Sequence, residues 1–319
     1  MSTGAFDKDD YPYLVNMRTV NVDAIKKSVA AFRPVVYTEE DIATNIPIKI
    51  RSTLEKFEDR YLVIYDNWRD TEYINGITDL FSERVRVRCN FKHHPSPLSY
   101  WKKNKQSILK RISKSKIHEL REYIYLNTKL CNNFRISVCL AILQIFKPKK
   151  WLDISAGWGD RLLSAILYGV EKYVASDPNL DLHPCYDHII NTFAPTRKSD
   201  YIIHPTGFEN APLQDTKFDI VFSSPPFFDL EQYSKHPGDS LQHTTELAWC
   251  VKFLWPSLLK AYHHLKRNGH MVLYISGSPT VMSYLMQLNA IMKYKGVIYF
   301  IDSRPRAMYV WQKTLSKAT

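Results

Sequence analysis

The residues whose types and spacing best suit chemistry form a tetrapeptide at the end of an apolar run. Residues 218–223 read as a buried strand, and Ser224, Pro225, Pro226 and Phe227 follow directly. The prolines fix φ, remove two backbone donors and hold the preceding residue extended. The carbonyl oxygens of Ser224 and Pro225 would then be fixed acceptors for an amino group, with Phe227 as a flat face beside it. A strand that simply ends at prolines is the structural alternative.

A glycine turn follows a second apolar run. The turn contains Asp153, Ser155, Ala156, Gly157 and Gly159. Glycines permit positive φ and close backbone approach, but this spacing is not the Gly-x-Gly-x-x-Gly of dinucleotide binders. The acid at its start favours a cationic ligand, and Asp153 is expected to accept a hydrogen bond from the amino group of a methionine moiety. A turn required only for packing is the alternative.

Two more strand ends carry candidate ligand contacts. Asp177 follows the strand expected at 172–176, where a carboxylate can accept from both hydroxyls of a ribose. An N-cap for the next helix is the other interpretation. Phe208 follows the strand expected at 201–204 and is a candidate for stacking on adenine. Ligands bind outside the carboxyl ends of such strands, so we expect these residues to share one site.

The glycine turn and the Ser-Pro-Pro-Phe segment together resemble the motifs of class I S-adenosylmethionine-dependent methyltransferases that modify exocyclic amino groups of nucleic-acid bases. The resemblance covers about residues 125–313. It implies that the turn binds the methionine part of the cofactor, that Asp177 binds the ribose, and that Phe208 flanks the adenine. The segment 132–135, with Asn133, is similar to the upstream motif that reaches the cofactor's carboxylate. The run 156–162 also resembles uncharacterised methyltransferases of phages and large DNA viruses.

This resemblance implies methyl transfer from S-adenosylmethionine to adenine N6 or cytosine N4, in DNA or RNA, with Ser224, Pro225, Pro226 and Phe227 as catalytic residues. Catalysis would be mainly positioning, and a stacked base would have to flip out to reach the pocket. Adenine-modifying members usually carry Asn or Asp where Ser224 stands, and Ser is more typical of cytosine-N4 enzymes. The target base therefore stays open.

A strongly basic segment indicates an anionic partner. Residues 83–116 contain eleven Lys or Arg and one acid, a net charge of +10, against +11 for the whole chain. Phe91, Tyr100 and Trp101 lie among these charges, which suits a groove that neutralises phosphates while rings stack on bases. A solvated helix face is the alternative. Nucleic acid, as DNA or RNA, is the expected partner, and nothing in the sequence indicates a protein partner.

The polar segment 228–244, next to the tetrapeptide, is typical of a lid over a site. Its candidate substrate contacts include Asp229, Glu231, Tyr233 and His236, and the segment 303–306 is a further candidate for binding phosphate. The substrate-binding residues that we predict are Phe228, Tyr233, Arg304, Lys102, Lys103 and Arg88.

The elements that must position these residues alternate from about residue 120. Helices are expected at 120–130, 137–146, 160–168, 183–192, 245–265 and 280–292, and strands at 150–155, 172–176, 201–204, 218–223, 270–275, 297–302 and 308–312. Such alternation predicts an α/β fold with a doubly wound, mostly parallel, Rossmann-like methyltransferase sheet. Before it, helices are expected at 23–32 and 50–61 and a strand at 60–68. The predicted division is a basic recognition region over 1–120 and a methyltransferase domain over 121–319.

Composition excludes several other classes. The five cysteines are odd in number and contain no Cys-x-x-Cys pair, so we expect no disulfide framework and a reducing compartment. Cys89 with His93 and His94 lacks a second ligand pair, so no metal site is predicted. No apolar run approaches the ~20 residues of a membrane span, so we expect a soluble intracellular protein, cytoplasmic or nuclear.

Two other functions compete with methyl transfer to a base. One is a non-catalytic nucleic-acid-binding subunit on a methyltransferase fold, against which the intact glycine turn and Asp177 argue. The other is a protein glutamine methyltransferase, which shares a similar Pro-Pro element. The basic cluster weighs against this second alternative.

Overall fold

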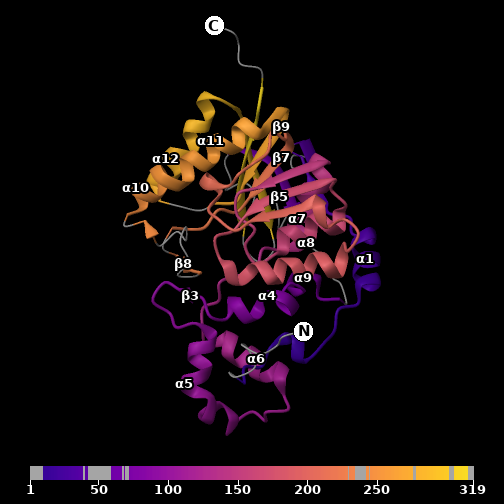
Figure 1. The fold of residues 1–319 in the computed structure, drawn as a ribbon, viewed down its shortest axis with the longest axis vertical. Helices are drawn as coiled ribbons and strands as arrows, with labels where there is room; N and C mark the ends of the chain where they lie inside the picture. Colours follow the sequence, from indigo (N-terminus) through magenta and orange to yellow (C-terminus); the bar gives the residue numbers. More distant parts are fainter. Residues whose placement is uncertain are drawn as a thin grey trace.

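The structure, a computed structural model, is built around one large mixed sheet (Figure 1). It describes residues 10–38, 40–41, 59–66, 68, 72–228, 230–233, 242–243, 245–275, 278–301 and 305–314. Within these residues the sheet has nine strands in the order β1-β2-β10-β11-β9-β7-β4-β5-β6. Their bounds are β1 Val35–Tyr37, β2 Arg60–Tyr65, β4 Lys150–Asp153, β5 Lys172–Ser176, β6 Tyr201–His204, β7 Phe218–Ser223, β9 Leu265–Leu273, β10 Lys293–Ile301 and β11 Pro305–Gln312.

The strand order confirms the predicted fold class. Strands β4, β5, β6, β7 and β9 are parallel where they pair, and β11 is antiparallel to both of its neighbours, β9 and β10. From β4 the chain moves outward through β5 and β6, then returns to place β7 on the other side of β4. This is the order of a Rossmann-like methyltransferase sheet. The reversal at β4 and β7 creates the crevice in which such folds bind ligands.

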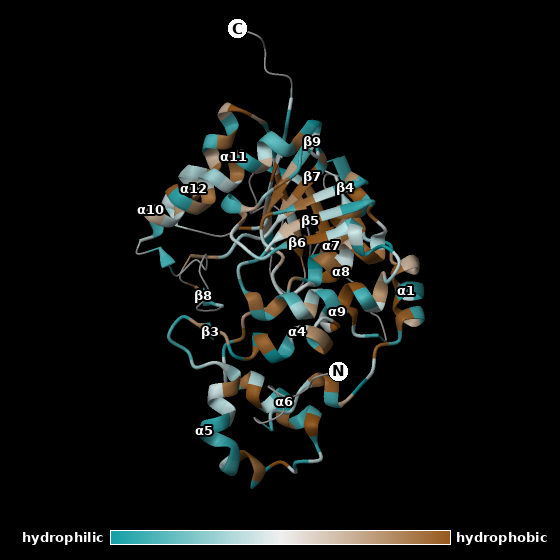
Figure 2. Ribbon diagram, in the orientation of Figure 1, coloured by the Kyte–Doolittle hydropathy of each residue, from teal (hydrophilic) through white to brown (hydrophobic). Residues whose placement is uncertain are grey.

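Helices cover both faces of the sheet (Figures 1 and 2). Their bounds are α1 Val22–Ala31, α4 Asp79–Arg86, α5 Pro97–Leu109, α6 Ile117–Leu126, α7 Ile136–Phe146, α8 Asp160–Tyr168, α9 His183–Phe193, α10 Glu246–Trp249, α11 Trp255–His264 and α12 Pro279–Met286. Successive strand residues point to opposite faces. Trp151 therefore packs in the cluster that contains residues of α7, α8 and α9, while Leu152 packs in the cluster with residues of α10, α11 and α12.

The N-terminal region contributes to the main sheet. Strand β2 pairs in parallel with β10, and β1 pairs with the outer side of β2. Helices α5 and α6 instead pack around a separate small cluster that includes Tyr11, Trp101 and Leu120, at the lower end of Figure 1. Trp101 is only 1% exposed, so its ring supports this cluster and is not open for stacking on a base. Helix α6 runs through residue 120, and a domain boundary at that residue stays a prediction.

A few elements differ from the sequence-based expectations. The long helix expected at 245–265 consists of α10, a π-helical segment at Cys250–Leu254, and α11. Strand β9 begins at Leu265, directly after α11 and five residues earlier than expected. The helix expected at 50–61 lies largely outside the described residues. Among the described helices, none has the length and apolar character needed to cross a membrane.

Candidate active site

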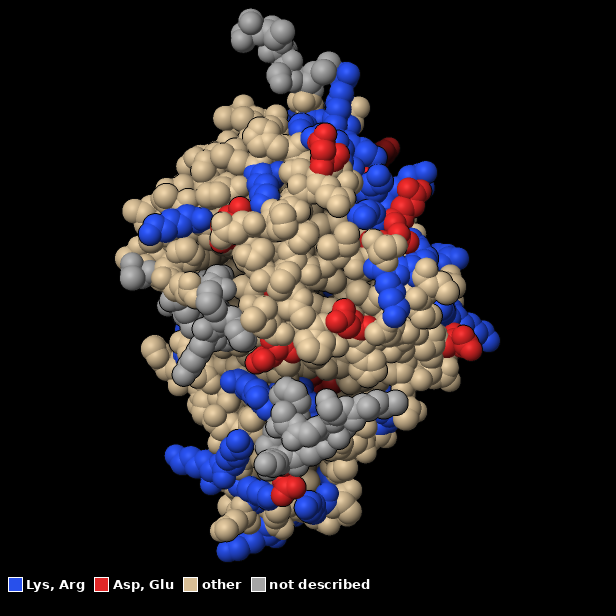
Figure 3. Space-filling view, in the orientation of Figure 1, with Lys and Arg blue, Asp and Glu red and all other residues tan. Residues whose placement is uncertain are grey.

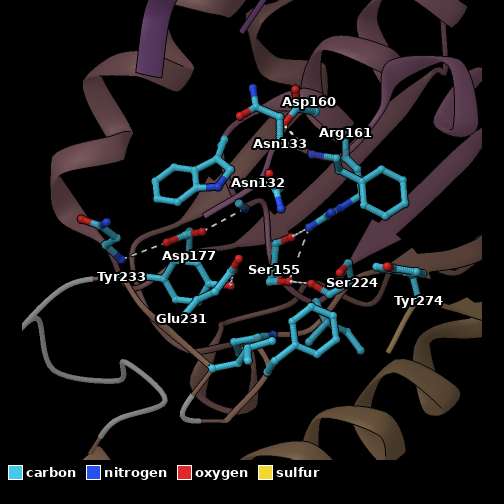
Figure 4. A pocket seen from close by; sticks show the side chains of 18 of the residues that line it. Asn132, Asn133, Ser155, Asp160, Arg161, Asp177, Ser224, Glu231, Tyr233 and Tyr274 are labelled. Atoms are coloured by element: carbon cyan, nitrogen blue, oxygen red, sulfur yellow. Dashed lines mark hydrogen bonds between the residues drawn. The ribbon is translucent and has the colours of Figure 1, made fainter. Parts of the chain in front are cut away.

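A cavity of about 440 Å³ lies where β4, β5, β6 and β7 end (Figure 4). The loops after all four strands contribute to its wall, and so do segments 132–135 and 230–233. Of the residues predicted from sequence, those that line it are Phe91, Asn133, Ser155, Gly157, Asp177, Phe208, Ser224, Pro226, Phe227, Glu231 and Tyr233. The fold therefore brings the predicted cofactor and catalytic motifs to one place.

The glycine turn is fixed by backbone conformation and by close packing. Gly157 has φ of 61° and Gly159 has φ of 95°, a region that favours glycine. A Cβ on Gly159 would lie 2.7 Å from Cδ1 of Ile189. Gly159 and Ala156 do not line the cavity, so they shape the turn, while Gly157 forms part of the wall.

The placement of Asp153 corrects its predicted role. Its side chain is 0% exposed and does not line the cavity. Its carboxylate accepts hydrogen bonds from Arg161 Nε at 2.8 Å and from the Tyr173 hydroxyl at 2.7 Å. Because a buried charge is stable only when it is paired, the carboxylate serves Arg161 and does not contact a ligand amine.

Arg161, which the sequence analysis did not select, stands where Asp153 was expected. It is 4% exposed, lines the cavity, and lies with its guanidinium 5.3 Å from the centre of the Phe134 ring. Its Nη2 donates to the backbone oxygen of Ser155, and its Nη1 has no hydrogen-bond partner among the described residues. Pairing with Asp153 raises the Arg161 pKa above its ordinary value despite burial, so the cavity wall carries a permanent cation. The Asp-Arg pair that opens α8 was the available sequence signal.

Asp177 lies in the cavity wall next to the glycine turn (Figure 4). One carboxylate oxygen accepts from the Gly157 N–H and the other from the Asn179 N–H, both at 3.0 Å. Burial raises the pKa of this carboxyl to about 6, and the two N–H donors act against that rise. Each oxygen keeps acceptor capacity for a ligand hydroxyl, because a carboxylate has about four lone-pair sites.

An aromatic pair lies at the end of the cavity next to β6. Phe208 follows β6, and Phe253 comes from the π-helical segment before α11. The Phe208 loop is held by Lys260, whose ammonium group donates to the carbonyl oxygens of Phe208, Glu209 and Ala211 at 3.0, 3.2 and 2.5 Å. The sequence analysis missed Phe253, because nothing in the residue pattern of 245–265 marks a π-helical turn within the expected α-helix.

The tetrapeptide only partly matches the predicted arrangement. The Ser224 carbonyl oxygen accepts a hydrogen bond from the Ser155 hydroxyl at 2.8 Å, so the cofactor turn and the tetrapeptide are directly linked (Figure 4). Pro225 is buried and does not line the cavity, which corrects the expectation that its carbonyl faces the ligand. The Phe227 ring lies edge-on to Tyr274, with ring centres 6.1 Å apart.

Upstream of α7, Asn133 serves the architecture of the wall. Its side-chain amide donates to the Thr78 hydroxyl at 2.9 Å and to Asp79 at 3.2 Å. Asp160 accepts from the Thr78 hydroxyl and from the Phe134 N–H, and burial raises the pKa of its carboxyl to about 7. This network fixes the segment 132–135 against α4 and the start of α8.

A two-stranded ribbon forms a further part of the wall, beside the glycine turn. Strand β8 (Glu231–Gln232) pairs with β3 (Asn90–Phe91), which belongs to the basic segment. Glu231 is 8% exposed and lines the cavity together with Tyr233, whose hydroxyl donates to the Glu231 carboxyl. The Tyr233 ring packs on Trp158, with ring centres 5.7 Å apart.

The remaining predicted substrate contacts lie elsewhere. Phe228 packs near Trp249 and does not line the cavity. Lys102, Lys103 and Arg88 are exposed and do not line the cavity. Helix α5, which carries the two lysines, lies at the lower end of the molecule, where basic side chains gather in Figure 3. Arg304 lies outside the described residues.

Two other arginines, Arg135 and Arg306, do line the cavity. Arg135 also pairs with Asp66 at 2.6 Å. Phe134, Tyr274, Phe300 and Met308 share this part of the wall.

Comparisons with known proteins find only distant similarities. No protein-family model and no curated protein matches the sequence. TrmN from Thermus thermophilus matches 56% of this chain and 49% of its own, with 14% identity and a TM-score of 0.42. A methyltransferase from Pyrococcus furiosus matches 57% of this chain and 84% of its own, with 16% identity and a TM-score of 0.40.

A further match is an S-adenosylmethionine-dependent O-methyltransferase from Thermotoga maritima, over 61% of this chain and 71% of its own, with 12% identity and a TM-score of 0.42. The chain thus spans about half the length of TrmN. None of these similarities is close enough to carry an inference about substrate, and the fold assignment rests on the strand order.

Proposed function

We propose that the protein transfers a methyl group from S-adenosylmethionine to the exocyclic amino group of a base in nucleic acid, adenine N6 or cytosine N4. The observation that carries this proposal is the hydrogen bond between Ser155 and the Ser224 carbonyl, because it joins the glycine turn to the Ser-Pro-Pro-Phe segment inside one cavity. Two motifs distant in sequence thus meet where a donor and an acceptor would have to meet.

The cavity wall offers a complementary group for each part of the cofactor. Phe253 suits the adenine ring, with Phe208, which is only 1% exposed, in the same apolar cluster at this part of the wall, and the Asp177 carboxylate suits the ribose hydroxyls. Arg161, whose Nη1 has no hydrogen-bond partner among the described residues and which has Gly157 beside it, suits the carboxylate of the methionine part. S-adenosylmethionine would supply the activated methyl group as a sulfonium.

The part of the wall around Phe227 suits a nucleobase. Phe134, Tyr274 and Phe300 supply aromatic surface, and Arg135 and Arg306 add positive charge next to it. Aromatic rings that stack on a base, with cations near its phosphates, are the usual means of holding an unpaired nucleotide. The exposed lysines of α5 would extend this contact along a nucleic-acid strand.

The test is methyl transfer to defined nucleic acids. The protein would be incubated with radiolabelled S-adenosylmethionine and single- or double-stranded oligonucleotides of DNA and RNA, followed by mass analysis of the nucleosides. We expect N6-methyladenine or N4-methylcytosine in one of these substrates. Phe227→Ala should lower transfer at least about tenfold while the cofactor affinity measured by calorimetry is retained, since stacking contributes about 1–3 kcal/mol.

Three results would contradict the proposal in different ways. Absence of both cofactor binding and transfer would reject it. Salt-sensitive nucleic-acid binding without cofactor binding would support the non-catalytic subunit. Transfer to protein glutamine and to no oligonucleotide would support the protein methyltransferase.

A further inference from the structure

The acceptor set of the tetrapeptide is incomplete. An exocyclic amine has two N–H groups, and the sequence predicted two carbonyl acceptors for them. In the structure the Ser224 carbonyl already accepts from Ser155 at 2.8 Å, which leaves it one lone pair and so an acceptor for only one of the two N–H groups, and Pro225 is buried outside the cavity. The Ser224 hydroxyl is a weaker acceptor than a carboxamide or a carboxylate. A strong acceptor for the amine is therefore required from another part of the wall.

Glu231 has the chemistry that this position requires. It lines the cavity with 8% of its surface exposed and forms no ion pair among the described residues. Its carboxyl accepts from the Tyr233 hydroxyl and from the Asn132 backbone N–H. Two donors leave lone pairs for a further N–H, and Figure 4 shows the side chain pointing into the cavity.

Backbone contacts tie Glu231 to the tetrapeptide. The Leu230 N–H donates to the Phe227 carbonyl at 2.8 Å, which closes a tight turn between Phe227 and Glu231. On the other side, the Lys92 N–H donates to the Leu230 carbonyl at 2.9 Å, and β3 pairs with β8. A turn and a ribbon thus hold the carboxyl in a fixed relation to Phe227, as catalytic positioning demands.

We propose that Glu231 is a catalytic residue that accepts an N–H of the target amine and then takes its proton. This inference rests on the proposed function. As the amine nitrogen forms its bond to the methyl carbon, the carbon–sulfur bond breaks and its electron pair stays on sulfur. The nitrogen then carries one proton too many, and that proton passes to the Glu231 carboxylate and from there to solvent.

The charges around Glu231 set its pH dependence. Burial raises the pKa of its carboxyl, whereas the Tyr233 hydroxyl, the Asn132 N–H and the charge of Arg86 lower it. The thiols of Cys89 and Cys131 also lie near this cluster, and burial raises the pKa of Cys131. Since the ionised carboxylate is the active form, kcat should rise with pH through the pKa of Glu231.

The primary test is Glu231→Gln, which keeps the size of the side chain and removes the charge. We expect kcat to fall about 100-fold or more, as when a general base is removed, with cofactor affinity by calorimetry within about twofold. Exposed Glu171, which does not line the cavity, provides the matched control Glu171→Gln with unchanged kcat. Equal kcat for Glu231→Gln and the unchanged protein would overturn the inference.

Tyr233→Phe gives a second test, because the pH dependence of kcat would not change if Glu231 had only a structural role. Removing its hydrogen bond to Glu231 raises the pKa of that carboxyl, so the acid limb of the kcat profile should shift to higher pH. A binding measurement without transfer complements it. Oligonucleotides in which the target base is replaced by its analogue without the amine (purine for adenine, 2-pyrimidinone for cytosine) should bind more weakly than the parent to the unchanged protein. In the Glu231→Gln variant, the two oligonucleotides should differ less in affinity.

These outcomes separate the two proposals. If Glu231→Gln keeps the kcat of the unchanged protein, only the role of Glu231 is overturned. The same holds if Tyr233→Phe leaves the acid limb of the kcat profile at the same pH. Lack of transfer by the unchanged protein rejects the proposed function and this inference together.

Discussion

At the cofactor turn, Asp153 and Arg161 have to be understood as a pair. A lone buried carboxylate would be costly, and the guanidinium 2.8 Å away supplies the opposite charge. The sequence indicates Asp153 as a candidate because it ends an apolar strand. It does not indicate that Arg161, eight positions later, forms a hydrogen bond with that carboxylate. The cavity wall consequently presents a cation, and the cofactor group that it suits changes from an ammonium to a carboxylate.

Asp177 leads to a prediction about pH and cofactor affinity. Its pKa is raised to about 6, and the carboxylate is the form that accepts from ribose hydroxyls. The dissociation constant for S-adenosylmethionine should therefore increase below pH 6, by up to about tenfold per pH unit. Calorimetry between pH 5 and 8 measures this dissociation constant. The Asp177→Asn variant should bind S-adenosylmethionine more weakly, and its dissociation constant should no longer depend on pH in this range. If the pH dependence persists in this variant, another group causes it.

At the scale of elements, the central strands could be predicted because each one is an apolar run buried on both faces. The bounds expected for β5, β6 and β7 are those observed. The acceptor role of Glu231 could not be predicted, since it depends on a two-residue ribbon between segments far apart in sequence. Short polar strands of this kind carry no periodic signal, and sequence analysis placed Glu231 only among several candidates in a loop.

At this scale, we predict the effect of replacing Lys260. Its three donors fasten the Phe208 loop to α11, and hydrogen bonds to a charged donor are worth about 1.5–3 kcal/mol each when buried. Lys260→Met should loosen the loop and weaken cofactor binding on the order of tenfold, while kcat at saturating cofactor stays near that of the unchanged protein. Lys252→Met, at an exposed lysine of the π-helical segment, is the control. A fall in kcat alone would mean that Lys260 does not act through the cofactor.

At the scale of the whole molecule, the exposed lysines of α5 lie apart from the cavity. Lys102 and Lys103 are exposed on α5, whose buried side rests on its own small core, whereas Arg86 of the same basic segment is buried in an ion pair with Asp79. Sequence counts treat these charges alike, and only the fold distinguishes a structural arginine from a surface lysine. The exposed group is the one that suits phosphates.

Reversing this surface charge should weaken nucleic-acid binding without affecting the cofactor. For Lys102→Glu with Lys103→Glu, we expect a higher dissociation constant for an oligonucleotide and a shallower dependence on salt. The slope of log affinity against log salt should flatten by about 0.7–0.9 for each phosphate that the protein no longer neutralises. Fluorescence anisotropy at several salt concentrations measures both quantities.

A matched pair of substitutions separates local contact from net charge. Lys198→Glu with Lys293→Glu makes the same change in net charge near the amino ends of β6 and β10, away from the cavity. We expect this pair to leave the affinity and the salt dependence close to those of the unchanged protein. Equal effects of the two pairs would show that only net charge matters.

The pairing of β2 with β10 has a consequence for how the protein is made. Val63 and Ile64 of β2 are almost completely buried, yet their neighbouring strand ends at residue 301. A ribosome must therefore synthesise the residues from β2 through residue 301 before β2 can pair with β10. Until then the edge of β2 that faces β10 has unmet backbone groups and is open to wrong partners, although β1 covers its other edge. Chaperones that shield nascent chains should therefore matter more for this protein than for one whose strands pair only with near neighbours in sequence.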